Sequence, residues 1–145
     1  MRAFMLFLCS FGSVGAFAVP FENWDALPDG TWQGGNGACL LKEERHQQPL
    51  PTFKTGDDAR TFAARLQQAL FAQKLVNVVT QPVEREGSWG VLASYRFASG
   101  GAEYNVSQLY LSSNGLLRTF TGSVKVGEFN QCVTDMQTFV RTMAK

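Results

Sequence analysis

The stretch that decides the fold runs from residue 88 to residue 126 and reads SWGVLASYRFASGGAEYNVSQLYLSSNGLLRTFTGSVKV. Apolar and polar residues alternate along it with a period of two, which is typical of strands that bury one face. Two turn-like links, Ser99-Gly100-Gly101 and Ser113-Asn114-Gly115, divide it into three runs. Asn-Gly between alternating runs is a strong hairpin signal. The stretch therefore predicts three antiparallel strands, over 88–97, 102–111 and 116–126.

The strand pattern extends toward the N-terminus. Residues 76–83 predict a fourth strand, joined to the next by Glu86-Gly87, and Pro82 within it favours an edge position or a bulge. A further short strand is expected over 38–42. The turn-rich residues 19–37, and the polar and proline-containing residues between 42 and Thr55, are expected to form loops. The sheet is thus predicted to be a meander of four or five strands.

Two segments carry a helical period instead. In residues 57–74 the apolar side chains form one stripe, and Thr55 or Asp57 can cap the helix. Residues 128–144 are predicted to form a second helix, with one arc of apolar residues that includes Cys132. The prediction is an α+β fold in which a four- to five-stranded antiparallel meander packs against these two helices.

The alternation also separates the two faces of the predicted sheet. One face is apolar and is expected to meet both helices; it carries Trp89, Val91, Ala93, Tyr95, Phe97, Tyr104, Val106, Tyr110, Phe120 and Val124. The other face is polar and is expected to face solvent; it carries Ser94, Arg96, Glu103, Asn105, Ser107, Thr119, Thr121 and Ser123.

The first 18 residues have the pattern of a cleavable signal peptide. Arg2 is followed by an apolar run and then by Ala16-Phe17-Ala18, a small-x-small cleavage site. The apolar run is shorter than the roughly 20 residues that span a bilayer. We expect cleavage before Val19, leaving residues 19–145 as a single domain in the periplasm or the medium, with no transmembrane segment.

Export also bears on the cysteines. Residues 19–145 contain Cys39 and Cys132 alone, and an even number of cysteines in an oxidising compartment favours a disulfide. Two separate buried thiols are the alternative. A redox-active pair is more often Cys-x-x-Cys, so we interpret the bond as structural.

The charge balance bears on the choice of partner. Without Arg2, 12 of the 13 Lys and Arg remain against 12 Asp and Glu, and no basic run is present. Nucleic-acid binding depends on clustered cations that neutralise phosphates. We therefore expect no nucleic-acid partner and no affinity for an anionic membrane surface.

The residue types that carry catalysis are sparse. His46, the one histidine, lies in a polar run expected to be a loop, and no serine stands in a Gly-x-Ser-x-Gly elbow. One histidine and two paired cysteines give no metal-ligand set, and the glycine run at 34–37 lacks the Lys-Ser/Thr of a phosphate loop. We expect no enzymatic activity, no metal and no cofactor.

What remains is binding. Turns presented by rigid strands suit recognition, which suggests Ser99, Gly100, Ser112, Ser113 and Asn114 as partner-binding residues. The alternative platform is the polar sheet face, at Asn105, Ser107, Thr119 and Thr121. A second alternative is a carrier that holds a small apolar ligand between sheet and helices, among Trp89, Tyr95, Tyr104 and Phe120.

The order strand, helix, four-strand meander, helix over residues 38–144 resembles the PsbP and Mog1-like α/β sandwiches, including bacterial envelope proteins of the DcrB type. Gly30-Thr31-Trp32 is similar to the Gly-x-Trp opening of lipocalins, although the helix at 57–74 departs from that barrel. Gln81-Pro82-Val83 partly resembles the cystatin hairpin. All three groups imply binding rather than catalysis. We expect an exported, non-enzymatic protein-binding module, such as an inhibitor or an immunity protein against a secreted toxin or hydrolase.

Overall fold

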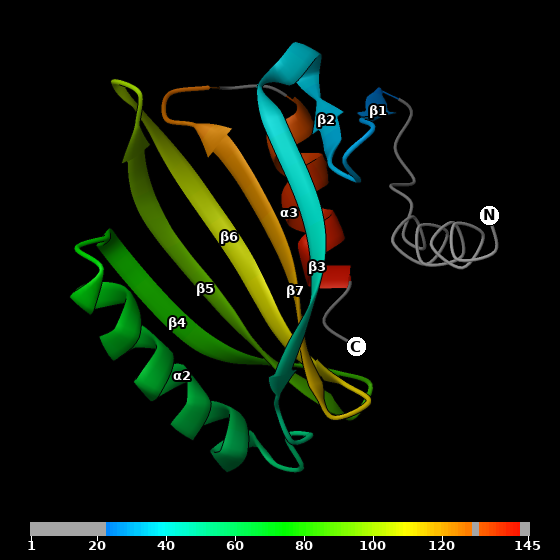
Figure 1. Ribbon diagram of the computed structural model, residues 1–145, viewed down its shortest axis with the longest axis vertical. Helices are drawn as coiled ribbons and strands as arrows, with labels where there is room; N and C mark the ends of the chain where they lie inside the picture. Colours follow the sequence, from blue (N-terminus) through cyan, green and yellow to red (C-terminus); the bar gives the residue numbers. More distant parts are fainter. Residues whose placement is uncertain (1–22, 129–130, 143–145) are drawn as a thin grey trace, which may run out of the picture.

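One antiparallel sheet of seven strands, in the order β1-β2-β3-β7-β6-β5-β4, forms the centre of the molecule (Figure 1). The computed structural model describes residues 23–128 and 131–142. The strands are β1 (Trp24–Ala26), β2 (Trp32–Gly34), β3 (Cys39–Pro49), β4 (Val76–Arg85), β5 (Ser88–Ser99), β6 (Ala102–Ser113) and β7 (Leu116–Lys125). The α+β class is confirmed, whereas the prediction of four or five strands is wrong.

Strands β4 to β7 form the predicted meander; the link Glu86-Gly87 is as expected, and the other two links are one residue shorter than expected. Glu86-Gly87, Gly100-Gly101 and Asn114-Gly115 each have two residues with positive φ, as a type I′ turn requires. Ser99 and Ser113 therefore belong to the strands, and pair with Ala102 and Leu116 across the turns.

The two helices lie on opposite faces of this sheet. Helix α2 (Gly56–Ala72) packs on β4 and β5, and α3 (Gln131–Thr142) packs on β3, β6 and β7. In Figure 1, α2 runs along β4 at one side of the molecule, and α3 runs along β3 and β7 at the other. Along β6, Tyr110 packs with the core under α2, while Leu109 and Leu111 belong to the core under α3. The prediction that both helices share one face is wrong.

The register of β6 and β7 explains this correction. The two-residue turn pairs Tyr110 with Thr119, so Phe120 and Val124 point to the α3 side. The predicted three-residue link Ser113-Asn114-Gly115 would instead pair even-numbered residues with even-numbered ones, which would place Tyr110 and Phe120 on the same face. A shift of one residue moves every side chain of a strand to the other face.

The helix ends agree closely with the sequence pattern. Thr55 is the N-cap of α2, and its hydroxyl accepts a hydrogen bond from the Asp58 backbone N–H at 3.2 Å. This helix ends at Ala72, two residues before the expected end. Helix α3 covers residues 131–142 of the predicted span 128–144, whereas Glu128 is not helical; the buried side of the helix includes Cys132, Met136 and Val140.

Strand β3 is longer than the predicted strand over 38–42, because it continues through the polar run to Pro49. Residues 42–45 pair with β7, whereas β2 pairs only with Cys39–Leu41 on the other side. Much of β3 is therefore an edge strand on the described part of the sheet, where charged residues and a terminal proline are normal. A polar composition was mistaken for a loop.

The turn-rich N-terminal residues also form strands. The turn between β1 and β2 is closed by hydrogen bonds from Leu27 N–H to Thr31 O (2.8 Å) and from Thr31 N–H to the Asp29 carboxylate (3.0 Å). The Asp29 pKa is lowered, chiefly by this bond from the Thr31 backbone.

The predicted disulfide is present between Cys39 and Cys132, whose Cα atoms are 6.1 Å apart. Both residues are buried in the core on the α3 side. The bond joins the start of β3 to the first turns of α3.

The predicted signal peptide, residues 1–18, lies outside the described residues. Within residues 23–128 and 131–142, neither helix combines the length and the apolarity needed to cross a membrane.

Candidate functional site

The five predicted partner-binding residues do not form one surface. Ser99 and Gly100 lie at the β5–β6 turn, and Ser112, Ser113 and Asn114 lie at the β6–β7 turn, at the opposite end of β6. Twelve residues of extended chain separate the two turns, which is a distance of about 40 Å. A single interface at both turns would have to span the whole sheet.

The β6–β7 turn is braced against the rest of the molecule. The Ser112 hydroxyl donates a hydrogen bond to Leu50 O at 2.5 Å, and the Leu50 backbone N–H donates one to Gly115 O at 2.9 Å. Leu50 is buried in the segment between β3 and α2. By contrast, among residues 23–128 and 131–142 no hydrogen bond joins Ser99, Gly100 or Gly101 to a residue outside the β5–β6 hairpin. Of the two turns, the β6–β7 turn is the better fixed.

The alternative platform is divided between the two faces of the sheet. Asn105 and Ser107 lie on the α3 side, opposite Val124 and Gly122, and they line a cavity of about 340 Å³ beside α3. Thr119 and Thr121 point to the α2 side. The prediction that these four residues share a face is wrong, for the register reason given above.

The aromatic residues of the carrier alternative are divided in the same way. Trp89 packs against the core under α2, and Tyr95 and Tyr104 point to that side. Phe120 is fully buried in the core under α3, where its ring meets Phe139 edge to face. Because the sheet separates them, these aromatics cannot line one cavity.

His46 lies on β3 rather than in a loop. Its Nε2 is hydrogen-bonded to the Thr119 hydroxyl at 3.0 Å on the α2 side of the sheet. Thr119 is almost fully buried. His46 thus provides a hydrogen-bond partner for the buried Thr119 hydroxyl. A catalytic triad built on this pair would also need an acidic side chain hydrogen-bonded to the other ring nitrogen of the histidine.

A polar network covers the middle of the α2-facing sheet surface. The Gln108 side chain accepts a hydrogen bond from the Tyr110 hydroxyl at 2.6 Å and donates one to Thr121 at 3.0 Å. Burial raises the pKa of Tyr95 and, still more, that of Tyr110, where the charge of Tyr95 adds to the effect. Both tyrosines are therefore neutral donors near neutral pH, which suits a structural network.

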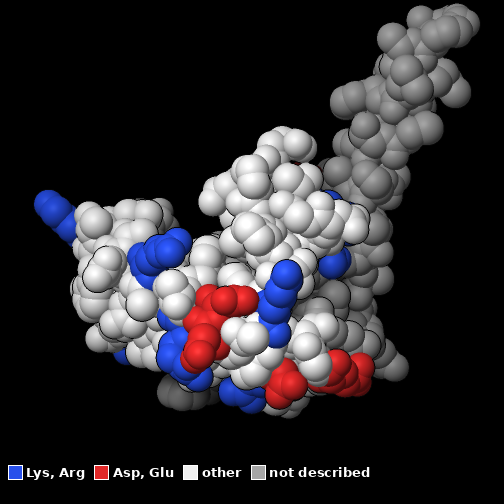
Figure 2. All heavy atoms as spheres, turned by 90° about the horizontal axis from the view of Figure 1, so that it is seen from below, with Lys and Arg blue, Asp and Glu red and all other residues white. Residues whose placement is uncertain are grey.

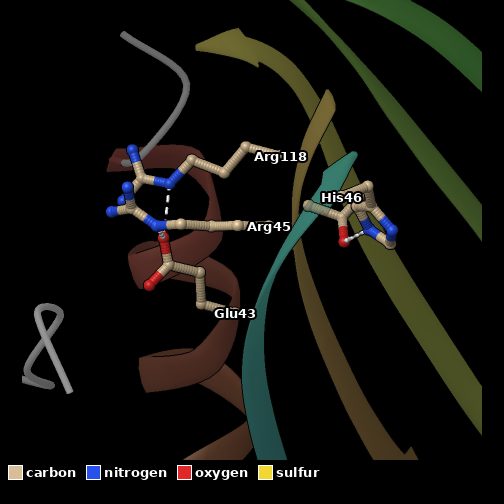
Figure 3. A network of polar contacts seen from close by, with 5 residues as sticks. Glu43, Arg45, His46 and Arg118 are labelled. Carbon is tan, nitrogen blue, oxygen red and sulfur yellow. Dashed lines mark hydrogen bonds and ion pairs between the residues drawn. The ribbon is translucent and has the colours of Figure 1, made fainter. Parts of the chain in front are cut away.

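On the opposite side of β3 and β7 lies a cluster of three charged residues. Arg45 and Arg118 are direct partners across the strand pair, and Glu43 lies beside them (Figure 3). One oxygen of Glu43, Oε2, accepts hydrogen bonds from Arg45 Nε at 3.1 Å and from Arg118 Nε at 2.5 Å. Figure 3 shows His46 pointing to the other side of the strands, so this cluster is separate from it.

The three side chains of this cluster differ in how far they are buried. The Glu43 side chain is 3% exposed, that of Arg118 is 21% exposed and that of Arg45 is 52% exposed. The Arg118 guanidinium also lies over the Phe120 ring, 4.7 Å from its centroid. We call Glu43, Arg45 and Arg118 the arginine cluster. Sequence reasoning missed it because 42–48 was expected to be a loop; the i, i+2 spacing of Glu43 and Arg45 was the available signal.

On the face shown in Figure 2, Lys and Arg lie side by side with Asp and Glu, and neither sign forms a continuous field. Among residues 23–128 and 131–142, no three His, Cys, Asp or Glu side chains are close enough together to hold a metal ion.

No protein-family model matches this chain, and a search of curated proteins finds no match.

Proposed function

We propose that this protein is an exported, non-catalytic module that binds another protein, as an inhibitor or an immunity protein does, and that it binds through the β6–β7 end of the sheet. The observation that carries the proposal is the bracing of this turn by Leu50. A surface that is already ordered loses little conformational entropy on binding. Binding through Asn114 and its neighbours therefore loses little conformational entropy.

The side chains around the turn support the same surface. Leu116, the first residue of β7, is 37% exposed. The arginine cluster follows on the same side of β7, since Leu116 and Arg118 have the same parity along the strand. Arginine is enriched at protein interfaces and among the residues that contribute most to binding. This end of the sheet thus offers an ordered turn, an apolar contact and arginine.

Export is supported by the disulfide between Cys39 and Cys132 and by the signal-like first 18 residues. Disulfides persist in oxidising compartments and are rare in the cytosol. The expected product is a chain that begins at Val19. The intact mass of protein purified from the periplasm or the medium tests this, and a mass that includes residues 1–18 would contradict it.

A site-specific photocrosslinker in the producing cells tests the binding surface. The photocrosslinking residue replaces Leu116 in one strain and Phe97 in a matched control strain. Phe97 is a strand residue near the opposite end of the sheet, and 46% of its surface is exposed. We expect illumination to give a discrete covalent adduct with one protein from position 116 and much less of it from position 97. Mass spectrometry then identifies the partner.

Binding of the purified partner completes the test. Leu116→Asp should weaken it strongly because the change places a charge at the centre of the proposed contact, whereas Phe97→Asp should leave it nearly unchanged. Equal adducts from both positions, or none from either in cells that make the protein, would contradict the proposed surface.

A further inference from the structure

The arginine cluster has more hydrogen-bonding capacity than its internal contacts use. A guanidinium carries five N–H donors, and in both arginines the contact with Glu43 is made by Nε. The structure gives the terminal Nη groups of Arg45 and Arg118 no partner among residues 23–128 and 131–142. In Figure 3 the two guanidinium groups lie next to each other, and their terminal nitrogens are on the side away from the strands.

Glu43 explains why two like charges are held so close. Arginines directly opposite each other in an antiparallel pair repel, and Arg45 and Arg118 are such a pair. The buried carboxylate compensates one of the two charges and fixes both guanidinium groups through one of its two oxygens, Oε2. The cluster keeps a net charge of +1, with rigid donors at a partly exposed position.

The chemistry of the unused donors identifies a ligand. A planar guanidinium binds carboxylates and phosphates through two parallel N–H···O bonds. A single net positive charge matches a carboxylate, which carries one negative charge, better than a phosphate, which carries nearly two at neutral pH. Leu116, on the same side of β7, would lie next to the bound group.

We propose that Arg45 and Arg118 bind a carboxylate group of the partner, supplied by an acidic side chain or by a chain terminus. This inference rests on the proposed function, because it names the group that the β6–β7 end of the sheet recognises. Glu43 is a positioning residue that orients both arginines and does not touch the ligand.

The test uses the disulfide-bonded protein from Val19 to Lys145 and small probes, so that it does not depend on the partner. The arginine side-chain N–H signals are followed by NMR during titration with three probes. The first is an N-acetylated tripeptide amide whose only carboxylate is a Glu side chain. The second is an N-acetylated triglycine with a free C-terminus, and the third is inorganic phosphate.

We expect saturable shifts of the Arg45 and Arg118 signals, with millimolar dissociation constants for at least one carboxylate peptide and weaker binding of phosphate. The comparison of the two peptides shows whether the carboxylate comes from a side chain or a terminus. Arg45→Gln should weaken the binding about tenfold, a change of about 1.4 kcal/mol. It leaves Arg118 to pair with Glu43, so the fold is kept.

Arg60→Gln is the matched control, because Arg60 is an exposed arginine on α2, and it should bind the peptides as the original chain does. The proposal is overturned if neither arginine signal shifts saturably in the unaltered chain, if Arg45→Gln binds as well as that chain, or if phosphate binds more tightly than both peptides. A saturable peptide site with no crosslinked partner would overturn the proposed function and leave the carboxylate site standing. A partner crosslinked from position 116, with no shift of either arginine NMR signal, would leave the proposed function standing and overturn the carboxylate site.

Discussion

Gly34 of β2 lies directly against the indole ring of Trp24, its register partner on β1. A Cβ at residue 34 would come within 2.6 Å of Trp24 Cδ2 and Cε2. The indole is buried in the same core as the disulfide, so the absence of a side chain at residue 34 allows the N-terminal hairpin to close over that core.

Gly34→Ala should therefore lower the free energy of unfolding by about 1–3 kcal/mol, the usual cost of overpacking. Gly34 has φ −125°, so the backbone itself accepts alanine. Urea unfolding measures the change. In a Trp24→Ala background the same substitution should cost almost nothing, since the clash is gone. An equal cost in both backgrounds would show that the ring contact is not the cause.

Removal of the disulfide tests the link between β3 and α3. The bond closes a loop with a sequence separation of 93 residues, and in the chain-entropy model such a loop contributes about 4–5 kcal/mol. Cys39→Ser with Cys132→Ser should lower the urea midpoint accordingly. Dithiothreitol should produce a similar shift in the unaltered protein and none in the double variant. An unchanged midpoint after confirmed reduction would contradict the prediction.

The capping hydroxyl of Thr55 offers a test of α2. Thr55→Ala removes the acceptor for the Asp58 N–H and should cost about 1 kcal/mol. Thr61 is an exposed residue within the same helix, and Thr61→Ala should leave stability unchanged or slightly raised, because alanine has the better helix propensity. Thermal unfolding followed by circular dichroism compares the two. Similar losses from both would contradict the capping role.

The buried tyrosines predict a loss of stability at alkaline pH. The ordinary tyrosine pKa is 10.0, and burial raises that of Tyr110 well above this value in the folded chain. Above pH 10 the unfolded chain loses this proton while the folded chain keeps it, so the free energy of unfolding falls as pH rises. Below pH 10 the residue adds no pH dependence.

Tyr110→Phe should flatten part of this alkaline decline, and Tyr95, whose pKa is also raised, should account for some of the rest. At neutral pH the same substitution should cost about 1 kcal/mol, because the hydrogen bond to Gln108 is lost. Urea unfolding at pH 7 and between pH 9.5 and 11 measures both effects. Tyr104→Phe serves as the comparison. An alkaline slope identical in all three proteins would contradict the assignment.

Much of the fold was determined by short stretches of the sequence. The period-two runs placed the four strands of the meander, and the apolar stripes placed both helices, with both ends of α2 correct to within two residues. Thr55 marked a helix start, and Pro82 marked an edge strand with a bulge nearby. Each of these signals acts within a few residues, so local patterns carry it.

The candidate site could be predicted only in part from local sequence patterns. The β6–β7 turn was identified from Asn114-Gly115, but its bracing by Leu50 joins residues about 60 positions apart. The arginine cluster joins Glu43 with Arg118, which are 75 positions apart. No local pattern reports such pairs.

The sequence by itself thus determined the two helices, the four strands of the meander and the turns between them, and it favoured a bond between Cys39 and Cys132. The tertiary structure decided which side of the sheet each strand residue faces, because one residue of register in the β6–β7 turn assigns Thr119 to one face and Phe120 to the other. It also decided that residues 42–49 extend β3, since the hydrogen bonds that hold them there come from β7. Periodicity is a property of neighbours in the chain, whereas register and strand pairing depend on distant partners.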